Sequence, residues 1–242
     1  MAKRIKLGML TPSCNNVLEP VTSAIVADIE GVTAHFGRFK VNDIALSEHS
    51  RRQFEYEPML EAARLLADAK VDVIAWNGTA GGWLGFDNDI RLCQLIEDAT
   101  GIPATSSVLA IEELFKRNNV KRFGLVSPYT EDVNRKIIEN FRGHGYVCTG
   151  EERTNGVDGY SFALIPDQQI SGMLRSVAKT KPDASVVFCT NMNGAPLADQ
   201  IEKETGVPIY DSLSATVWKS LLIAGADTSK VKGWGQLFSP AN

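Results

Sequence analysis

One cysteine stands where α/β proteins expose reactive side chains. The apolar run at 185–189 predicts a buried strand that ends in Cys189, and Thr190 follows. The carboxyl end of a strand is where open parallel sheets place their ligands. A thiol there could act as an acid, a base or a nucleophile, and a helix that began nearby would lower its pKa through the N-terminal dipole. A lone cysteine is more often an inert core residue, so spacing alone leaves both interpretations open.

Polar turns follow three further apolar runs. The first holds Pro12, Ser13, Cys14 and Asn15, the second holds Asn77, Gly78, Thr79 and Ala80, and the third holds Tyr129. Backbone N–H groups in such turns, the Asn15 amide and the hydroxyls of Thr79 and Tyr129 could donate hydrogen bonds to an anion. The structural alternatives are a helix N-cap at Asn15, a turn with positive φ at Gly78 and simple packing of Tyr129 at an interface.

These turns belong to a chain that repeats itself. The segment around Gly8 is echoed around Gly124, and the motif Thr-Gly-Ile-Pro at 100–103 returns as Thr-Gly-Val-Pro at 205–208. Two related α/β halves normally pack about a pseudo-twofold axis, with their strand ends facing one crevice. The four turns are therefore expected to meet in that crevice.

Apolar runs alternate with amphipathic segments along the whole chain. Strands are predicted at 5–10, 32–39, 71–76, 104–106, 122–126, 146–148, 185–189 and 208–210, and helices most clearly at 58–69, 87–99, 107–117, 131–142 and 196–205. This alternation predicts an α/β fold of two similar halves, each with a parallel four-stranded sheet.

The halves are expected to divide unevenly along the sequence. We assign 1–115 plus 213–242 to the N-terminal half, because a late helix at 213–225 is expected to return to it, and 116–212 to the C-terminal half. The weakly patterned stretch at 149–170 is rich in Gly, Asn and Asp and is expected to form a mobile loop over the crevice.

Composition argues against several classes of function. The 242 residues carry a net charge of −4 with no Lys/Arg run, so nucleic acid is not expected as a partner. No apolar stretch approaches the roughly 18 residues of a membrane span, and a soluble, cytoplasmic protein is expected. Four cysteines without CxxC spacing and three histidines indicate neither a metal site nor a disulfide framework. A homo-oligomer is left open.

Four short motifs together resemble the aspartate/glutamate racemase superfamily, specifically its maleate isomerase and arylmalonate decarboxylase branch. They are Pro12-Ser13-Cys14-Asn15, Asn77-Gly78-Thr79, Pro128-Tyr129 and Cys189-Thr190. Racemases and isomerases of that family use two cysteines, one from each half, and no cofactor, whereas the decarboxylases keep only the second cysteine and have glycine at the first position. Cys189 matches the second cysteine, and the first position falls on Gly78, or on Asn77 if the turn is shifted by one residue.

The missing first thiol favours decarboxylation. Two-base racemisation needs an acid or base on each face of the reacting carbon, and maleate isomerisation in the family uses the first cysteine as nucleophile. Loss of CO₂ from a disubstituted malonate leaves an enediolate that needs only stabilisation and one proton. The resemblance therefore implies a cofactor-independent decarboxylase of malonate-like dicarboxylates in which Cys189 is the acid.

The resemblance also implies roles for the neighbouring residues. Asn15, Thr79, Tyr129 and the backbone N–H of Thr190 would hold the carboxylate oxygens. An apolar wall for the departing carboxylate is expected from Trp76, Trp83, Leu84 or Phe188, although such aromatic residues also serve as plain core.

Three residues depart from the decarboxylase pattern or complicate it. Ala80 stands where the decarboxylases have a serine donor, and Cys14 stands where the family usually has serine. Cys14 is either an unreactive replacement or a second thiol in the crevice, and Thr79 could replace the first cysteine, as a threonine does elsewhere in the superfamily. A maleate cis-trans isomerase or an amino-acid or hydantoin-type racemase is therefore the alternative, and a small-carboxylate binding protein is a third hypothesis.

Overall fold

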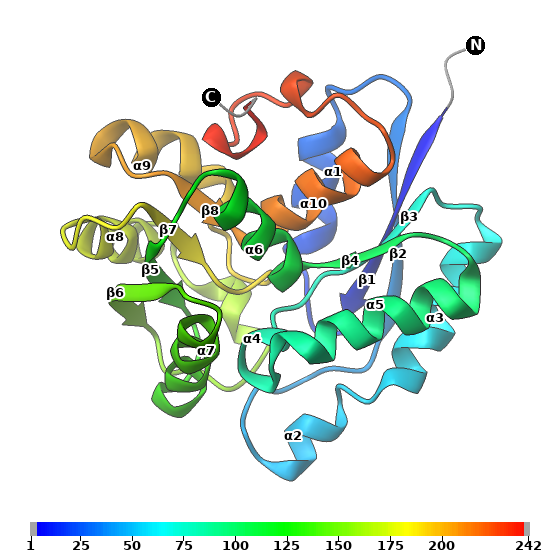
Figure 1. Cartoon of the computed structure of the whole chain (residues 1–242), viewed down its shortest axis with the longest axis horizontal. Coiled ribbons are helices and arrows are strands. Elements are labelled where there is room, and N and C mark those ends of the chain that lie inside the picture. Colours follow the sequence, from blue (N-terminus) through cyan, green and yellow to red (C-terminus); the bar gives the residue numbers. More distant parts are fainter. Residues whose placement is uncertain (1–3, 240–242) are drawn as a thin grey trace.

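Two parallel four-stranded sheets with the same strand order organise the chain. The computed structural model describes residues 4–239. The first sheet has the order β2-β1-β3-β4 and the second has the order β6-β5-β7-β8. The strands are β1 (Ile5–Pro12), β2 (Val32–Phe39), β3 (Val73–Trp76), β4 (Ala104–Ser106), β5 (Arg122–Ser127), β6 (Val147–Arg153), β7 (Ala184–Val187) and β8 (Ile209–Asp211). Figure 1 shows the two sheets on opposite sides of the molecule, and the predicted fold class is confirmed.

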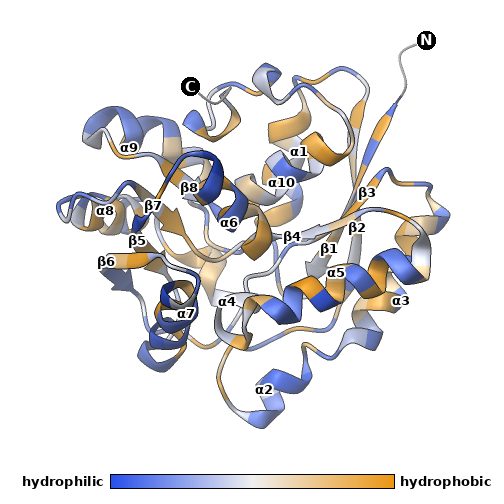
Figure 2. Cartoon of the chain, viewed as in Figure 1, coloured by the Kyte–Doolittle hydropathy of each residue, from blue (hydrophilic) through white to orange (hydrophobic). Residues whose placement is uncertain are grey.

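Helices follow most strands and cover the sheets. They are α1 (Leu18–Val26), α2 (Glu48–Arg52), α3 (Tyr56–Asp68), α4 (Gly81–Leu84), α5 (Phe86–Thr100), α6 (Ser107–Arg117), α7 (Glu131–Gly143), α8 (Asp167–Ala178), α9 (Ala198–Thr205) and α10 (Ser212–Ile223), with short 3₁₀ helices η1 (Ser161–Leu164), η2 (Ala195–Leu197), η3 (Thr228–Lys230) and η4 (Gln236–Phe238). In the first half α3 packs on α5 and α1 packs on α10, while in the second α8 packs on α9. Figure 2 shows hydrophobic residues concentrated in the central strands and hydrophilic residues on the outer helices.

The repeated glycines occupy equivalent positions in the two sheets. Gly8 of β1 pairs with Ile74 of β3, and Gly124 of β5 pairs with Ser185 of β7. A Cβ at Gly124 would lie 1.9 Å from Cγ1 of Val177, so only glycine lets that helix side chain pack over the strand.

The repeated Thr-Gly motif ends a helix in each half in the same way. The hydroxyls of Thr100 and Thr205 each donate, at 2.7 Å, to the carbonyl four residues earlier. Gly101 and Gly206 follow with φ of 69° and 71°, a left-handed conformation that favours glycine at a helix end. The resemblance between the halves therefore extends to individual hydrogen bonds.

The composition of residues 149–170 predicts a loop, but a strand and a helix occupy the two ends of this stretch. β6 continues to Arg153, which pairs with Ser127, and α8 begins at Asp167. The buried positions Ile170, Leu174 and Val177 of α8 have helical spacing, a signal that the polar residues around 165–169 obscured. The connecting segment at 154–166 contains η1.

The late helix α10 joins the two halves. It packs mainly on α6 and also on α1 and β3, elements of the first half, and it begins at the carboxyl end of β8. The division into 1–115 plus 213–242 and 116–212 stays a prediction, and residues 1–3 and 240–242 lie outside the described residues.

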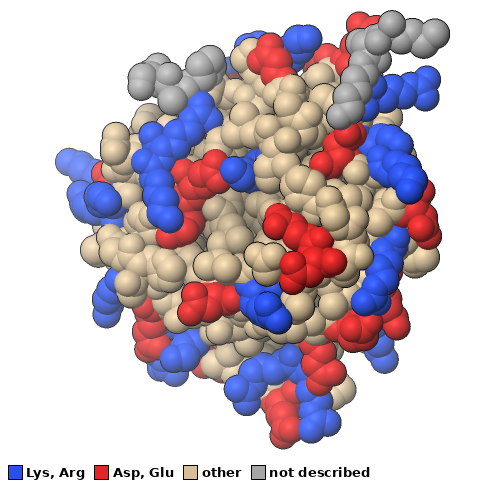
Figure 3. Space-filling view, turned by 45° about the vertical axis from the view of Figure 1, so that its right-hand side comes forward, with Lys and Arg blue, Asp and Glu red and all other residues tan. Residues whose placement is uncertain are grey.

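The surface carries both signs of charge. On the face drawn in Figure 3, acidic and basic side chains are interspersed around a tan, hollowed centre. Within residues 4–239, no helix is long and apolar enough to cross a membrane.

Candidate active site

A small cavity of about 40 Å³ lies where the carboxyl ends of both sheets meet. The turns after β1 and β3 bring residues of the first half to its wall, and the turns after β5 and β7 bring residues of the second. The predicted site residues that line it are Pro12, Cys14, Asn15, Gly78, Thr79, Ala80, Tyr129, Cys189 and Thr190. The four turns that the sequence singled out therefore form one site.

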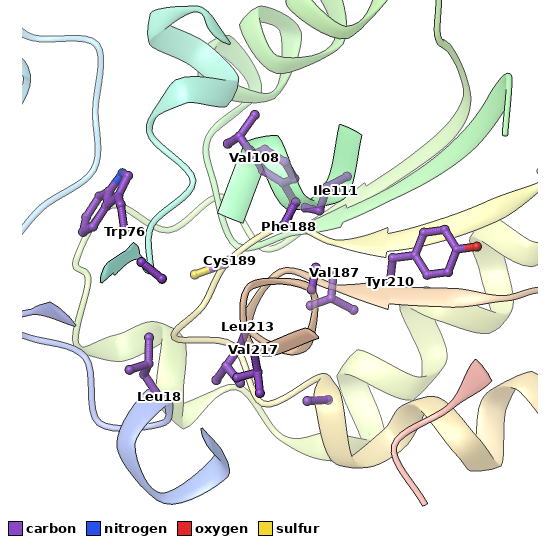
Figure 4. Close-up of a cluster of buried hydrophobic side chains, with 14 of the residues drawn as sticks. Leu18, Trp76, Val108, Ile111, Val187, Phe188, Cys189, Tyr210, Leu213 and Val217 are labelled. Atoms are coloured by element: carbon purple, nitrogen blue, oxygen red, sulfur yellow. The ribbon is translucent and has the colours of Figure 1, made fainter. Parts of the chain in front are cut away.

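Cys189 is buried at this site with its proton retained. Burial raises the pKa of its thiol to about 12. No helix begins close enough to lower the pKa of this thiol, because the next helical segment, η2, begins only at Ala195. The Tyr129 phenol and the Asn191 backbone N–H hydrogen-bond the sulfur and partly offset the effect of burial. Figure 4 shows the sulfur directed away from Val187 and Phe188. A thiol that keeps its proton at neutral pH is suited to act as an acid.

A chain of hydroxyl groups reaches this thiol from the other half. The hydroxyl of Thr79 lies 2.7 Å from the phenol oxygen of Tyr129, and Tyr129 in turn hydrogen-bonds Cys189. Burial raises the pKa of Tyr129 well above its ordinary value, so the phenol stays a hydrogen-bond donor. The geometry therefore places donors beside the sulfur that would stabilise a thiolate once its proton has left.

A second chain fixes the neighbouring turns. Asn15 Nδ2 donates to Thr190 Oγ1 at 3.2 Å, and Thr190 Oγ1 donates to the Asn77 carbonyl at 2.9 Å. Asn15 Oδ1 also accepts from the N–H groups of Val17 and Leu18 at the start of α1. The N-cap residue of α1 is Val17 and not Asn15, but the Asn15 side chain accepts hydrogen bonds at the start of that helix and also lines the cavity. The Thr190 hydroxyl links the two halves.

Two candidates lie in these turns without lining the cavity. The Ser13 hydroxyl donates to the Val41 carbonyl at 3.1 Å, and Asn77 Nδ2 donates to the Ala75 carbonyl at 2.9 Å. Both side chains hold loops in place. Gly78 lines the cavity, but it is not among the glycines with positive φ, so its φ does not explain the absence of a side chain.

No charged side chain is found among the described residues that line the cavity. The nearest cation to the first turn lies behind it: Arg38 Nη1 donates to the carbonyls of Ser13 and Asn15, and Arg38 pairs with Glu19 at 2.8 Å. A substrate carboxylate would therefore meet neutral donors only. In residues 4–239, no group of three or more His, Cys, Asp or Glu side chains is placed to hold a metal ion.

The chain matches the family model described as arylmalonate decarboxylase over residues 8–238. The chain belongs to the arylmalonate decarboxylase family. It is 23% identical to maleate isomerase of Geobacillus stearothermophilus over 91% of this chain and 92% of that protein, and 24% identical to arylmalonate decarboxylase of Bordetella bronchiseptica over 75% and 77%.

Solved structures agree on the fold. A cysteine-to-serine mutant of Nocardia farcinica maleate cis-trans isomerase, with a covalently bound succinylcysteine intermediate, matches with a TM-score of 0.88 at 20% identity. The match covers 97% of this chain and 98% of that one. The family match and these relatives confirm the predicted placement in the maleate isomerase and arylmalonate decarboxylase branch. It makes the chain a member of an enzyme family whose relatives include both a lyase and isomerases.

The sequence of this family member did not reveal the whole cavity. Trp76 and Trp83 line it as expected, whereas Leu84 and Phe188 do not. The additional lining residues are Val41, Ile44, Phe54, Gly159, Phe162 and Asn191. Asn191 could have been predicted, because it is a polar residue that follows a strand, as the other site residues do. The apolar residues lie in loops or, for Phe162, in the short helix η1, and belong to no motif.

Two of these loops, 42–44 from the first half and 157–159 from the second, join at the cavity. Asp43 and Asp158 form an antiparallel bridge, the N–H of Ile44 donates to the Val157 carbonyl at 2.9 Å, and the N–H of Gly159 donates to the Asn42 carbonyl at 2.8 Å. Asn191 Nδ2 also donates to the Gly159 carbonyl at 2.7 Å. The segment at 154–166 is thereby attached to both halves.

Proposed function

We propose that the protein is a cofactor-independent decarboxylase of disubstituted malonate-like dicarboxylates. The observation that carries this proposal is the asymmetry of the cavity. Cys189 presents a protonated thiol from the second half, whereas Gly78, at the matching turn of the first half, presents no side chain. One acid is enough for a reaction that adds one proton.

The steps follow from that asymmetry. The bond between the central carbon and one carboxylate breaks, CO₂ leaves, and the electron pair remains as an enediolate on the other carboxylate. Cys189 then gives its proton to the central carbon, which produces a monocarboxylate and a thiolate. Tyr129 and the N–H of Asn191 stabilise that thiolate until it takes a proton from water.

Neutral donors are available for the charge on the enediolate. The backbone N–H groups of Thr79, Ala80 and Thr190 have no backbone acceptor among the described residues. These groups and the Thr79 hydroxyl are the proposed oxyanion donors. Ala80 contributes its N–H alone, where the family's decarboxylases have a hydroxyl as well.

Within residues 4–239 no cation lines the cavity, and this supports loss of CO₂. A lysine or arginine beside each carboxylate would stabilise the dianionic substrate more than the transition state, in which charge leaves one carboxylate. Here Trp83, Phe54 and Phe162 are part of the wall instead. A carboxylate against such a surface is poorly solvated, which favours its release as neutral CO₂.

Maleate isomerisation or racemisation is the second candidate function. It is favoured by Cys14, which brings another thiol to the cavity wall, and by the relatives named maleate isomerase. Cys14 would have to act as a thiolate, but burial raises its pKa. This cost adds to the absence of a side chain at Gly78, which is the main reason for ranking decarboxylation first.

Proton NMR in D₂O tests the proposal. The protein is incubated with 2-methyl-2-phenylmalonate and, separately, with maleate, alongside Cys189→Ala and a control variant, Cys148→Ala, whose thiol lies on β6 away from the cavity. We expect 2-phenylpropionate with one deuterium at the α-carbon from wild type and Cys148→Ala, and none from Cys189→Ala. Fumarate from maleate would favour the second candidate. Equal decarboxylation by Cys189→Ala would contradict the assigned acid.

A further inference from the structure

The space that a side chain at position 78 would need is already filled. A Cβ built on Gly78 would lie 2.1 Å from Cζ2, 2.4 Å from Cη2 and 2.7 Å from Cε2 of Trp76. All three atoms belong to the six-membered ring of the indole. These distances are far below van der Waals contact, so even alanine at 78 requires Trp76 to move.

Trp76 is held in that place by its own neighbours. It is the last residue of β3, is 1% exposed, and packs against Phe39 and Phe54 with ring centroids 5.2 and 6.5 Å away. Its carbonyl accepts a hydrogen bond from Ser107 Oγ at 3.3 Å. A large ring in a close-packed setting cannot turn aside without displacing these partners.

The indole also reaches the reaction site. Trp76, Gly78 and Cys189 all line the same cavity. Figure 4 shows Trp76 and Cys189 coming from different elements, with the sulfur directed toward the side on which Trp76 lies. The first half thus presents an aromatic ring, whose carbon atoms neither give nor take a proton, where a side chain at 78 would otherwise stand.

We propose that Trp76 is a specificity-determining residue of this site. Its indole occupies the position of a first-half acid or base, keeps side chains and water from that face of the intermediate, and so restricts protonation to the face of Cys189. The part of the proposal that concerns the face of protonation rests on the proposed decarboxylation. The packing of Trp76 against Gly78 is independent of any reaction.

Thermal unfolding tests the packing with four proteins: wild type, Gly78→Ala, Trp76→Leu and the double variant. We expect Gly78→Ala to lower Tm by roughly 4 °C or more, since overpacking of this kind is costly in a chain of this size. The same substitution should cost less than half as much in the Trp76→Leu protein. Equal losses in both backgrounds would overturn the proposal.

Two further variants keep this test interpretable. Gly172→Ala is the matched control, because a Cβ at Gly172 of α8 would meet no atom within 4 Å, and its Tm should not fall. If Trp76→Leu does not fold, Trp76→Phe serves as the second background, since its smaller ring lacks part of the indole.

The stereochemical part is tested by chiral analysis of 2-phenylpropionate made from 2-methyl-2-phenylmalonate. Wild type should give one enantiomer, and Trp76→Leu should give a mixture while remaining dependent on Cys189. A product from Trp76→Leu as enantiopure as that of wild type would overturn the role in specificity. Absence of decarboxylation by wild type would instead contradict the proposed function, and the Tm comparison would still decide the packing.

Discussion

The Thr79 hydroxyl and the Tyr129 phenol lie 2.7 Å apart, although they belong to turns of different sheets. Their hydrogen bond crosses the crevice and continues to Cys189. Cys189, the proposed acid of one half, is therefore linked by hydrogen bonds to a residue of the other half. A site of this kind exists only when both halves are folded and in contact.

Replacing Tyr129 by phenylalanine should slow turnover. The variant loses the donor that stabilises the Cys189 thiolate and orients Thr79, and removal of one such donor typically costs roughly 10²–10³ in rate. The measurement is kcat for decarboxylation, with Tyr210→Phe as control, because Tyr210 is another buried tyrosine that does not line the cavity. Similar losses in both variants would show that the effect is one of general stability.

Cys14→Ser should leave decarboxylation nearly unchanged. Serine keeps the size of the side chain, and the proposed mechanism takes its single proton from Cys189. Initial rates with the substituted malonate provide the measurement. A fall of about 100-fold or more, which is about 2.7 kcal/mol in the activation free energy, would show that the first-half thiol takes part in the reaction.

Alkylation of Cys189 by iodoacetamide should be slow at neutral pH. Because burial raises its pKa to about 12, little thiolate is present at neutral pH. As long as the pH stays below the pKa, the thiolate fraction increases tenfold for each unit by which the pH is raised. Peptide mapping by mass spectrometry should find Cys14, which is only partly buried, labelled first. Rapid labelling of Cys189 at pH 7 would mean that its thiolate is stabilised, and a nucleophilic role would then be favoured.

Asp211→Asn should stabilise the protein at alkaline pH. Burial raises the pKa of Asp211 from 3.8 to about 7, and its Oδ2 has no hydrogen-bond partner among the described residues. The folded state therefore binds more protons than the unfolded state between these two values, so stability falls as pH rises from about 4 to 7 and stays low above 7.

The variant removes that charge and retains an oxygen to accept from the N–H groups of Leu213 and Ser214. Its Tm at pH 8 should exceed that of wild type by roughly 3 °C or more, with a smaller difference at pH 5. Asp68→Asn, at an exposed position at the end of α3, is the control and should show neither effect. An equal gain at both pH values would contradict the assigned titration.

The sequence predicted the elements whose signals are local. The strand at 32–39 and the helix at 107–117 have the predicted bounds, because β-branched or aromatic residues and helical spacing mark them clearly. The α8 helix was missed because Pro166 and the polar residues after it resemble a loop. Residues 149–153 of β6 were missed because Glu151 and Arg153 are typical of a surface, although they extend the sheet.

The polar part of the site was predictable for a different reason. Residues such as Asn15, Thr79 and Cys189 follow strands, and strand order places strand ends together. The apolar wall was not predictable, since Val41, Ile44 and Phe162 reach the cavity from connecting segments whose paths depend on tertiary contacts. The raised pKa of Cys189 also depends on burial, which no local sequence signal reports.

The joined loops at 42–44 and 157–159 make the opening of the crevice measurable by amide exchange. Widening the crevice must separate the Ile44 and Gly159 amides from their carbonyl partners, which lie in the opposite half. Hydrogen–deuterium exchange at those two amides would then be no faster than the opening of the crevice between the two halves. Their exchange rates would therefore set a lower limit on how often the crevice opens to admit a bulky substrate.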